Sequence, residues 1–279
     1  MVFGCHTLDL KYPRIMGILN VTPDSFSDGG QLLRGQSVDV DALLNRAEQM
    51  IDAGADILDV GGESTRPGAD PVSEMEELDR VLVAVDALTM RFDTIVSVDT
   101  STPSVMVEAA NLRIGLLNDV RGFRRPGALE AAAGTDLPVC VMHMRGEPDT
   151  MQTDPSYSDV ISDIATFFGR RLNSCDAAGI NPSKVILDPG FGFGKTSSHN
   201  FEILARLNEL CVWDCPLLVG LSRKSMISSL LGRPPQETVF ASAALALLAV
   251  QRGASIVRVH DVQATADALA MYNALPRGD

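Results

Sequence analysis

The turn that decides between two α/β folds lies in Arg14–Asp28, whose sequence is RIMGILNVTPDSFSD. The segment begins as an apolar run that ends at Asn20, and it continues as a polar turn. In an open, doubly wound sheet, the first such turn usually carries the pattern GxGxxG, which lets the backbone approach a dinucleotide. The turn Asn20–Phe26 lacks this pattern. It therefore favours a closed barrel over an open sheet.

Seven more β-rich runs follow the first, and segments of helical periodicity separate them. The eight runs are Arg14–Asn20, Ile57–Gly62, Thr94–Thr100, Gly115–Val120, Pro138–Met144, Val185–Gly190, Pro216–Ser222 and Ser255–Asp261. After Ser73, apolar residues recur every three or four positions from Leu78 to Leu88, as on one face of a helix. Eight strand–helix units predict the α/β class and a single (β/α)8 TIM barrel. We expect this barrel domain over residues 14–275, with residues 1–13 as a short N-terminal cap.

The composition limits the kinds of partner that the chain can have. Its formal net charge of −13 argues against general binding to nucleic acid or to an acidic membrane, which needs a broad basic surface. Cationic side chains for an anionic substrate would therefore have to be gathered locally. The most apolar stretch, Phe240–Val250, is shorter than the roughly 20 residues that span a bilayer. We expect it to form a buried helix.

The cysteines and the first residues favour a cytoplasmic protein. The five cysteines are odd in number and match neither a zinc motif nor CxxC, so we expect free thiols in a reducing compartment. The opening sequence MVFGCHTLDLKY lacks the basic and long apolar regions of a secretory signal.

Polar side chains stand at the ends of nearly all the runs. They are Asn20, Asp59, Asp99, Asn118, His143, Asp188, Ser222 with Lys224 nearby, Arg258 and His260. In a (β/α)8 barrel the active site forms at the C-terminal ends of the strands. Each of these residues alone could be a helix cap or a turn residue. Their repeated placement favours one ligand-binding site instead.

Three loops after these runs add to the predicted site. The first, Asn20–Gly30, is long enough for a mobile lid, although an idle surface loop is the alternative. The second, Gly61–Ala69, combines glycines, hydroxyls and Arg66; it could close on an anion, or it could be a plain turn. The third, Asp188–Thr196, resembles a P-loop but has Pro189 where that motif needs glycine. Its glycines favour close approach of a flat ligand.

Two sets of side chains at the strand ends suggest two kinds of ligand group. Asp99, Asn118 and Asp188 offer acceptors that suit the adjacent N–H donors of a pterin-like or guanine-like ring, and Lys224 adds a cation for a ring carbonyl or nitrogen. A second set, consisting of Asn20, Arg66, Arg258 and His260, could bind a phosphate or pyrophosphate. An ion pair of Arg258 with Asp59 or Asp261 is the alternative for that arginine. The sequence contains no nucleophile-elbow serine that would indicate a catalytic triad.

The motifs around these residues resemble those of the dihydropteroate synthases. The two longest are Gly17–Gly30 (GILNVTPDSFSDGG) and Asp59–Gly68 (DVGGESTRPG). Shorter matches follow in order at Ser97–Thr100, Leu117–Asp119, Met142–Met144, Ile186–Lys195, Gly220–Ser225 and Arg258–Asp261. The resemblance covers essentially the whole chain. It implies that 6-hydroxymethyl-7,8-dihydropterin pyrophosphate and p-aminobenzoate are condensed to 7,8-dihydropteroate and pyrophosphate, with Mg²⁺ on the pyrophosphate.

The resemblance also implies a role for each site residue. The pterin would be held by Asp99, Asn118, Asp188 and Lys224 in a pocket lined by Met142, Phe193 and Gly220. The pyrophosphate would be bound by Asn20, Arg66, Arg258 and His260, with Asn20 as a magnesium ligand. The p-aminobenzoate pocket, which also binds sulfonamides in this family, would be formed by Phe26, Thr65, Pro67, Ser222 and Arg223. Asp99, Asp188, Lys224 and Arg258 would act in catalysis. Family members are usually homodimers, so a homodimer is expected.

Three other functions are compatible with a pterin-binding barrel of this kind. A corrinoid-linked methyltransferase that binds methyltetrahydrofolate should lack the paired TPDSFSDGG and ESTRPG loops. A non-catalytic pterin-binding paralogue should have lost Asn20, Arg258 or His260, and all three are intact. A drug-insensitive synthase often carries substitutions near the aminobenzoate site. At that site, Phe26, Pro67 and Ser222 are the residues usual for the family.

Overall fold

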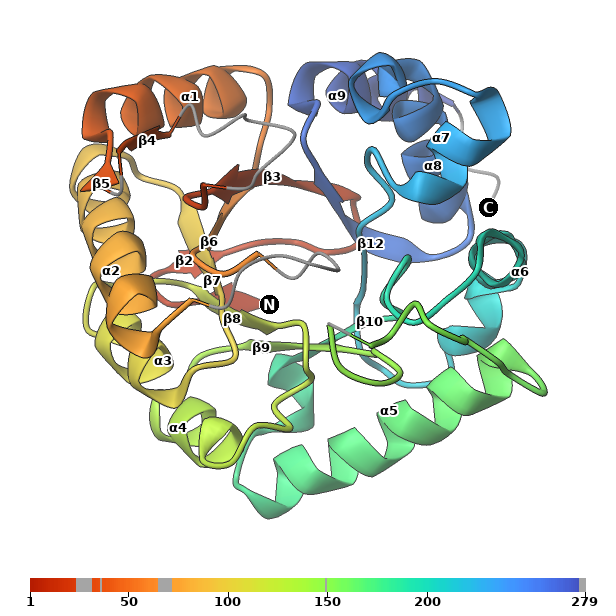
Figure 1. Ribbon diagram of the computed structural model, residues 1–279, viewed down its shortest axis with the longest axis horizontal. Coiled ribbons are helices and arrows are strands. Elements are labelled where there is room, and N and C mark those ends of the chain that lie inside the picture. Colours follow the sequence, from red (N-terminus) through yellow and green to blue (C-terminus); the bar gives the residue numbers. More distant parts are fainter. Residues whose placement is uncertain (24–31, 36, 65–71, 149, 276–279) are drawn as a thin grey trace.

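Eight parallel strands close into a barrel in the order β10-β11-β12-β3-β6-β7-β8-β9. The computed structural model describes residues 1–23, 32–35, 37–64, 72–148 and 150–275. The barrel strands are β3 (Arg14–Asn20), β6 (Ile57–Gly61), β7 (Ile95–Asp99), β8 (Leu116–Asp119), β9 (Val139–Met142), β10 (Val185–Asp188), β11 (Leu217–Val219) and β12 (Ala254–Val259). Figure 1 looks down this barrel, with helices around the strands. The predicted fold class is confirmed.

Nine helices are found in the described part of the chain, and most follow a barrel strand. They are α1 (Val40–Asp52), α2 (Glu74–Arg91), α3 (Pro103–Ala110), α4 (Ala128–Gly134), α5 (Val160–Ala177), α6 (Ser197–Ala205), α7 (Ser225–Leu231), α8 (Val239–Gln251) and α9 (Val262–Asn273). Short 3-10 turns occur at Pro182–Lys184, Leu207–Leu210 and Pro235–Glu237. A capping box between Ser73 and Glu76 starts α2. Its buried face includes Val81, Val85 and Leu88, as the stripe predicted.

Side chains inside the barrel change from apolar to polar along the strands. Near the N-terminal ends, one buried cluster contains Phe3, Met16, Ile57, Ile95, Leu116, Cys140, Ile186, Leu218 and Ile256. Alternate residues of a strand face the same side. Two positions further along five of these strands stand Asp59, Ser97, Asn118, Asp188 and Arg258. The C-terminal half of the interior is therefore charged and polar.

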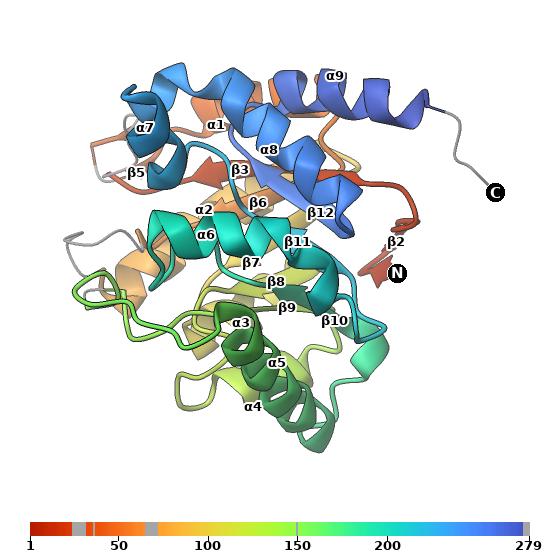
Figure 2. The same ribbon diagram turned by 90° about the vertical axis from the view of Figure 1, so that its right-hand side faces the viewer.

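A hairpin of β1 (Val2–Phe3) and β2 (His6–Thr7) covers the apolar end of the barrel. Phe3 is fully buried there, and Met1, Leu8 and Leu10 pack against the same cluster. Figure 2 shows the hairpin at the opposite end of the barrel from α7. A second small hairpin, of β4 (Leu33–Arg34) and β5 (Ser37–Val38), precedes α1. The open end is thus the one where the strands finish.

Two predictions about individual elements were inaccurate. Seven of the eight predicted runs extend past the observed C-terminal end of the strand, because the chain turns soon after the last inward residue; His143, Ser222 and His260 therefore lie in loops. The segment Phe240–Val250 is helical in α8, but Phe240 is 87% exposed, so the expected burial was wrong. No helix in the described ranges is both long and apolar enough to cross a membrane.

Candidate active site

A network of charged side chains crosses the polar half of the barrel. From β12, Arg258 donates through Nε to Asp59 Oδ2 (2.6 Å) and through Nη2 to Asp99 Oδ2 (2.9 Å). Asp59 also accepts from Ser97 Oγ (2.5 Å) and from Asn118 Nδ2 (3.3 Å). Asp59 is fully buried, and these three donors offset the cost of removing its charge from water. The ion pair of Arg258 with Asp59, left open by the sequence, is present.

Asp99, the second carboxylate of the network, lies nearer the mouth of the barrel. It is the last residue of β7 and stands beside Asn118 in the strand register. Burial raises the pKa of the Asp99 carboxyl above its usual range, although the Arg258 charge opposes this shift. The nearby Asp59 charge reinforces it. The structure therefore brings two of the predicted pterin-binding residues together at adjacent strand ends.

Asp188 ends β10 and faces the same interior. Its Oδ1 accepts from the backbone N–H of Gly190 (2.7 Å), and its carbonyl accepts from the N–H of His143 (2.8 Å). Burial raises the pKa of the Asp188 carboxyl to about 6, against the Gly190 bond and the charges of Lys224 and Lys195. Asp188 is thus an ionisable acceptor whose position is fixed by two backbone bonds.

The glycine-rich loop after Asp188 brings an aromatic ring against a lysine. Lys224 Nζ lies 4.3 Å from the centroid of the Phe193 ring, a cation–π contact. Gly192 lies against the Lys224 side chain: a Cβ there would come within 3.3 Å of Lys224 Cδ. Phe193 also packs on a small buried cluster that includes Met142. Phe193, Met142 and Lys224 are therefore gathered on one side of the mouth.

The loops after β11 and β12 form another side of the mouth. Ser222 Oγ lies 3.2 Å from the N–H of His260 and 3.1 Å from its Nδ1. Arg223, with a φ of 58°, binds Asp261 through Nε (2.9 Å) and Nη2 (2.5 Å). Asp261 therefore pairs with Arg223. At Gly220, a Cβ would be 4.0 Å from Arg258 Cβ, so this glycine leaves space above the arginine.

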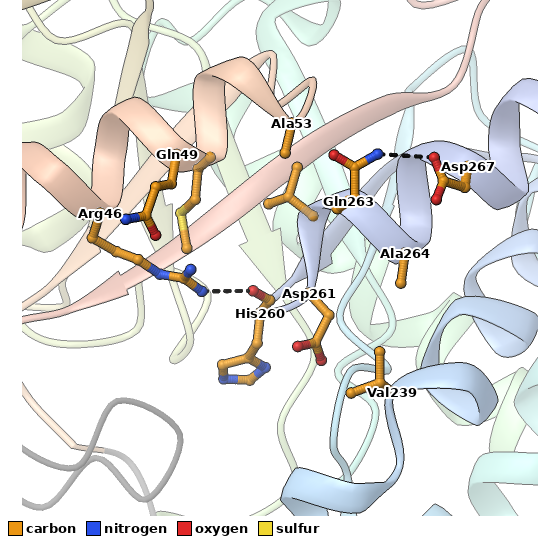
Figure 3. Close-up of a pocket in the computed structure, with 11 residues that line it drawn as sticks. Arg46, Gln49, Ala53, Val239, His260, Asp261, Gln263, Ala264 and Asp267 are labelled. Carbon is orange, nitrogen blue, oxygen red and sulfur yellow. Dashed lines mark hydrogen bonds between the residues drawn. The ribbon is translucent and has the colours of Figure 1, made fainter.

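A groove of about 490 Å³ runs along the outside of the barrel beside His260. Figure 3 shows that α1 contributes Arg46 and Gln49, that Ala53 follows at the C-cap of this helix, and that the groove continues along the start of α9. Arg46 Nη2 donates to the His260 carbonyl (3.1 Å). The groove therefore adjoins the mouth but is separate from the buried carboxylates.

The remaining predicted site residues belong to β3 or to the first two loops. Asn20 is half-buried at the end of β3, where it pairs with Gly61 in the register. The predictions for Phe26, Thr65, Arg66 and Pro67 fall outside the described residues.

Sequence reasoning gave no role to several buried polar residues. Ser97 binds Asp59, and Lys195 is enclosed within the glycine-rich loop. Arg121 makes two bonds to Glu63 (2.9 and 3.1 Å) at the base of the second loop. The alternation Ile95–Ser97–Asp99 could have revealed that Ser97 faces inward. His143, one partner of Lys195, and Glu63, the partner of Arg121, come from other loops, and no sequence signal pairs them.

Comparisons with known proteins identify the family of this chain. The profile of the family described as pterin binding enzyme matches residues 16–260. The dihydropteroate synthase of Haemophilus influenzae is 52% identical over 96% of this chain and 95% of its own length. A crystal structure of Yersinia pestis dihydropteroate synthase in complex with a sulfonamide drug has a TM-score of 0.95 at 52% identity, covering 98% of each chain. The Xanthomonas albilineans dihydropteroate synthase in complex with 7,8-dihydropteroate has a TM-score of 0.85 at 42% identity, covering 96% of this chain and 97% of that one.

The profile match extends from the first barrel strand to the last, and it includes the buried carboxylates and the loops that surround them. The sequence identity to these two synthases exceeds one half over nearly the full length of both chains. The chain belongs to the pterin-binding enzyme family and, within it, to the dihydropteroate synthases.

Proposed function

We propose that the strand-end residues of this chain condense 6-hydroxymethyl-7,8-dihydropterin pyrophosphate with p-aminobenzoate. The observation that carries this assignment is the convergence of Asp99, Asn118 and Asp188 on one buried mouth with Lys224. A carboxylate can accept two adjacent N–H bonds from the amidine-like edge of a pterin. The complexes of the Yersinia and Xanthomonas relatives with a sulfonamide and with dihydropteroate support the same substrates.

The pterin would lie between the carboxylates and the glycine-rich loop. Asp188 would accept from the N–H groups of the ring, and Asn118 would bind its edge. Lys224 would bind a ring carbonyl or nitrogen. Phe193, Met142 and Gly220 would line the faces of the pocket. The buried position of Asp188 and the contact of Phe193 with Lys224 support this placement.

The pyrophosphate would bind on the cationic side of the mouth. Arg258 carries five N–H donors, and its bonds to Asp59 and Asp99 take two of them. His260 directly follows the same strand, and Arg66 would complete the group. One guanidinium would then connect the acidic pocket to the leaving group.

Magnesium would bind chiefly through the pyrophosphate, with Asn20 as a protein ligand. Among the described residues, no group of three His, Cys, Asp or Glu side chains could hold a metal. Mg²⁺ commonly takes few protein ligands and keeps waters and substrate phosphates. The amide of Asn20 fits this role, because Gly61 leaves room beside its Oδ1, which lies 3.4 Å from where a Cβ would be. The bound ion would neutralise charge on the leaving pyrophosphate.

The p-aminobenzoate pocket would be formed by Ser222, Arg223, Phe26, Thr65 and Pro67. Ser222 is held at the mouth by His260, and Arg223 is oriented by Asp261. A sulfonamide would compete for the same pocket, so we infer that the enzyme is sulfonamide-sensitive.

The charge layout favours a dissociative displacement. The C–O bond to the pyrophosphate would break first, leaving positive charge on the carbon attached to the pterin ring. Asp188 and Asp99 would stabilise that charge, while Arg258 would stabilise the departing anion. The amine nitrogen of p-aminobenzoate would then form the new C–N bond and lose a proton. None of these steps needs a covalent enzyme intermediate.

The outer surface supports a homodimer. The exposed apolar side chains Leu230, Leu231, Phe240, Leu248 and Met271 lie on α7, α8 and α9. These helices lie next to one another in Figures 1 and 2. Exposed apolar side chains on neighbouring helices are typical of an interface between protomers. We propose that a second copy of the chain covers these three helices.

The chain would work as one barrel domain, residues 14–275, capped by residues 1–13. All five cysteines are free thiols. Such thiols fit the reducing cytoplasm that we propose as its compartment.

Replacing Asp188 by Asn tests the pterin assignment. The amide keeps the shape of the side chain but removes the charge and one of its two acceptor oxygens, so affinity for a pterin should fall at least tenfold, equivalent to about 1.4 kcal/mol. The loss should be measured by calorimetry with 6-hydroxymethylpterin. Asp163→Asn, on the exposed surface of α5, serves as the control and should bind like the wild type. Equal affinity in both variants would contradict the role of Asp188.

A further inference from the structure

Lys195, near the end of the third loop (Asp188–Thr196), is only 3% exposed. Its Nζ lies 2.8 Å from the Gly190 carbonyl and 2.9 Å from the Phe193 carbonyl. It also lies 3.0 Å from His143 Nδ1 and 3.3 Å from the His143 carbonyl. Among the described residues, no carboxylate lies within ion-pair distance of this nitrogen. The lysine is therefore surrounded by backbone carbonyls and one imidazole.

This environment suits an ammonium group. An ammonium has three donors and no acceptor, and its neighbours here are three carbonyl oxygens and a ring nitrogen. Burial and the Lys195 charge lower the pKa of His143 to about 2, so the imidazole is neutral and its Nδ1 can accept. Burial lowers the pKa of Lys195 to about 7, and the Asp188 charge opposes this shift. A neutral amine would leave some of these acceptors without a donor.

The acceptors around Lys195 belong to the two loops that hold Asp188. The N–H of Gly190 binds Asp188 Oδ1, and the N–H of His143 binds the Asp188 carbonyl. The two loops also touch directly: Gly190 has a φ of 67°, and a Cβ there would lie 1.9 Å from the His143 carbonyl oxygen. Lys195 thus joins the backbone on both sides of the carboxylate.

The other end of the same loop carries Phe193. Lys195 binds the carbonyl of Phe193, whose ring faces Lys224 at 4.3 Å. The intervening carbonyl of Gly192 accepts from Gln152 Nε2 at 2.5 Å. One ammonium therefore fixes the backbone at both Gly190 and Phe193.

We propose that Lys195 is a positioning residue for the pterin pocket. Its buried ammonium binds the loops after β9 and β10 and thereby holds Asp188 and Phe193 in place. The proposal rests on the pterin-binding role proposed above for Asp188 and Phe193. Lys195 does not touch the substrate in this account. It acts through the backbone, and its charge adds to the cations that favour the ionised form of Asp188.

Lys195→Met tests this role, because methionine keeps the unbranched chain and removes all three donors. Lys184→Met is the matched control: Lys184 flanks the other end of β10, and its Nζ binds Asp136 at the surface. Affinity should be measured by calorimetry for two probes, 6-hydroxymethylpterin and inorganic pyrophosphate with Mg²⁺. We expect Lys195→Met to weaken pterin binding at least tenfold while changing pyrophosphate binding less than about twofold. Lys184→Met should leave both affinities within about twofold of the wild type.

Kinetics provide a second readout that general destabilisation does not predict. In Lys195→Met the KM for the pterin substrate should rise at least tenfold, and the KM for p-aminobenzoate should stay within about threefold. A folded Lys195→Met protein that binds pterin like the wild type would overturn the proposal. If the wild type itself failed to bind pterin, the proposed function would be contradicted as well.

A milder variant keeps the test decisive if Lys195→Met does not fold. His143→Phe retains an aromatic ring at this position but removes the Nδ1 acceptor. It should weaken pterin binding three- to tenfold and leave pyrophosphate binding unchanged. Wild-type pterin affinity in folded His143→Phe would contradict the link between this cluster and the pocket.

Discussion

At the scale of single residues, the centre of the site is Asp59, whose carboxylate has no contact with the substrate in the proposed binding mode. It accepts from Ser97, Asn118 and Arg258, and through Arg258 it is linked to Asp99. A buried carboxylate that lost one of these partners would carry an uncompensated charge, which is costly. The network therefore keeps Asn118 and Arg258 at fixed positions before any ligand arrives.

The raised pKa of Asp188 predicts how pterin binding depends on pH. The carboxyl titrates at about 6, so it is ionised above that pH and becomes protonated below it. Because binding to the ring N–H groups requires the carboxylate, affinity should be about tenfold lower at pH 5 than at pH 7. Calorimetry with 6-hydroxymethylpterin across this range measures the effect.

Asp188→Asn is the control for this pH dependence, because an amide does not titrate. In that variant the step near pH 6 should be absent. A wild-type affinity that stayed level down to pH 5 would contradict the prediction that pterin binding follows the ionisation of Asp188.

The sequence predicted the site residues that stand at strand ends, but not the bonds between them. The positions of Asp99, Asn118 and Asp188 follow from the apolar runs that precede them and from the geometry of parallel strands. Their partners do not follow, because the bond between Arg258 and Asp59 joins residues 199 positions apart. Arg258 had two candidate partners in the sequence, and only the closed barrel decides between them.

At the scale of elements, α8 shows the limit of hydrophobicity as a guide to burial. Its inner face is built from small residues, among them Ala243, Ala246 and Ala249. Its bulky side chains Phe240 and Leu248 point outward. An apolar run too uniform to show a one-sided stripe predicts a helix but not which face is covered. The prediction that Phe240–Val250 is buried was wrong because it was inferred from the average hydrophobicity of the segment.

The exposed face of α8 predicts the effect of a charge placed on it. In a homodimer that buries Phe240, Phe240→Glu would bury an unpaired carboxylate and should shift the protein to the monomer. Sedimentation velocity over a hundredfold range of concentration measures this shift, and circular dichroism checks the fold. Met75→Glu on α2, at a side chain that is 67% exposed, is the matched control and should remain dimeric. A monomeric wild type, or a dimeric Phe240→Glu variant, would contradict the proposed interface.

At the scale of the whole molecule, the barrel separates stability from chemistry. The hairpin and the apolar layer at one end bury Phe3 and its neighbours, whereas the other end holds the charged network. The sequence predicted this division from the order of apolar and polar residues along each strand. A net charge of −13 also predicted that cations would be local, and Arg258, Lys224 and Lys195 are gathered around the carboxylates at the mouth.

The most direct test of the account is a pyrophosphate-release assay with purified protein and Mg²⁺. The dihydropterin pyrophosphate and p-aminobenzoate are supplied separately and then together. We predict rapid release only when both are present, and inhibition of that release by a sulfonamide that p-aminobenzoate overcomes. Equal release without p-aminobenzoate, or no release with both substrates, would contradict the condensation assigned to this barrel.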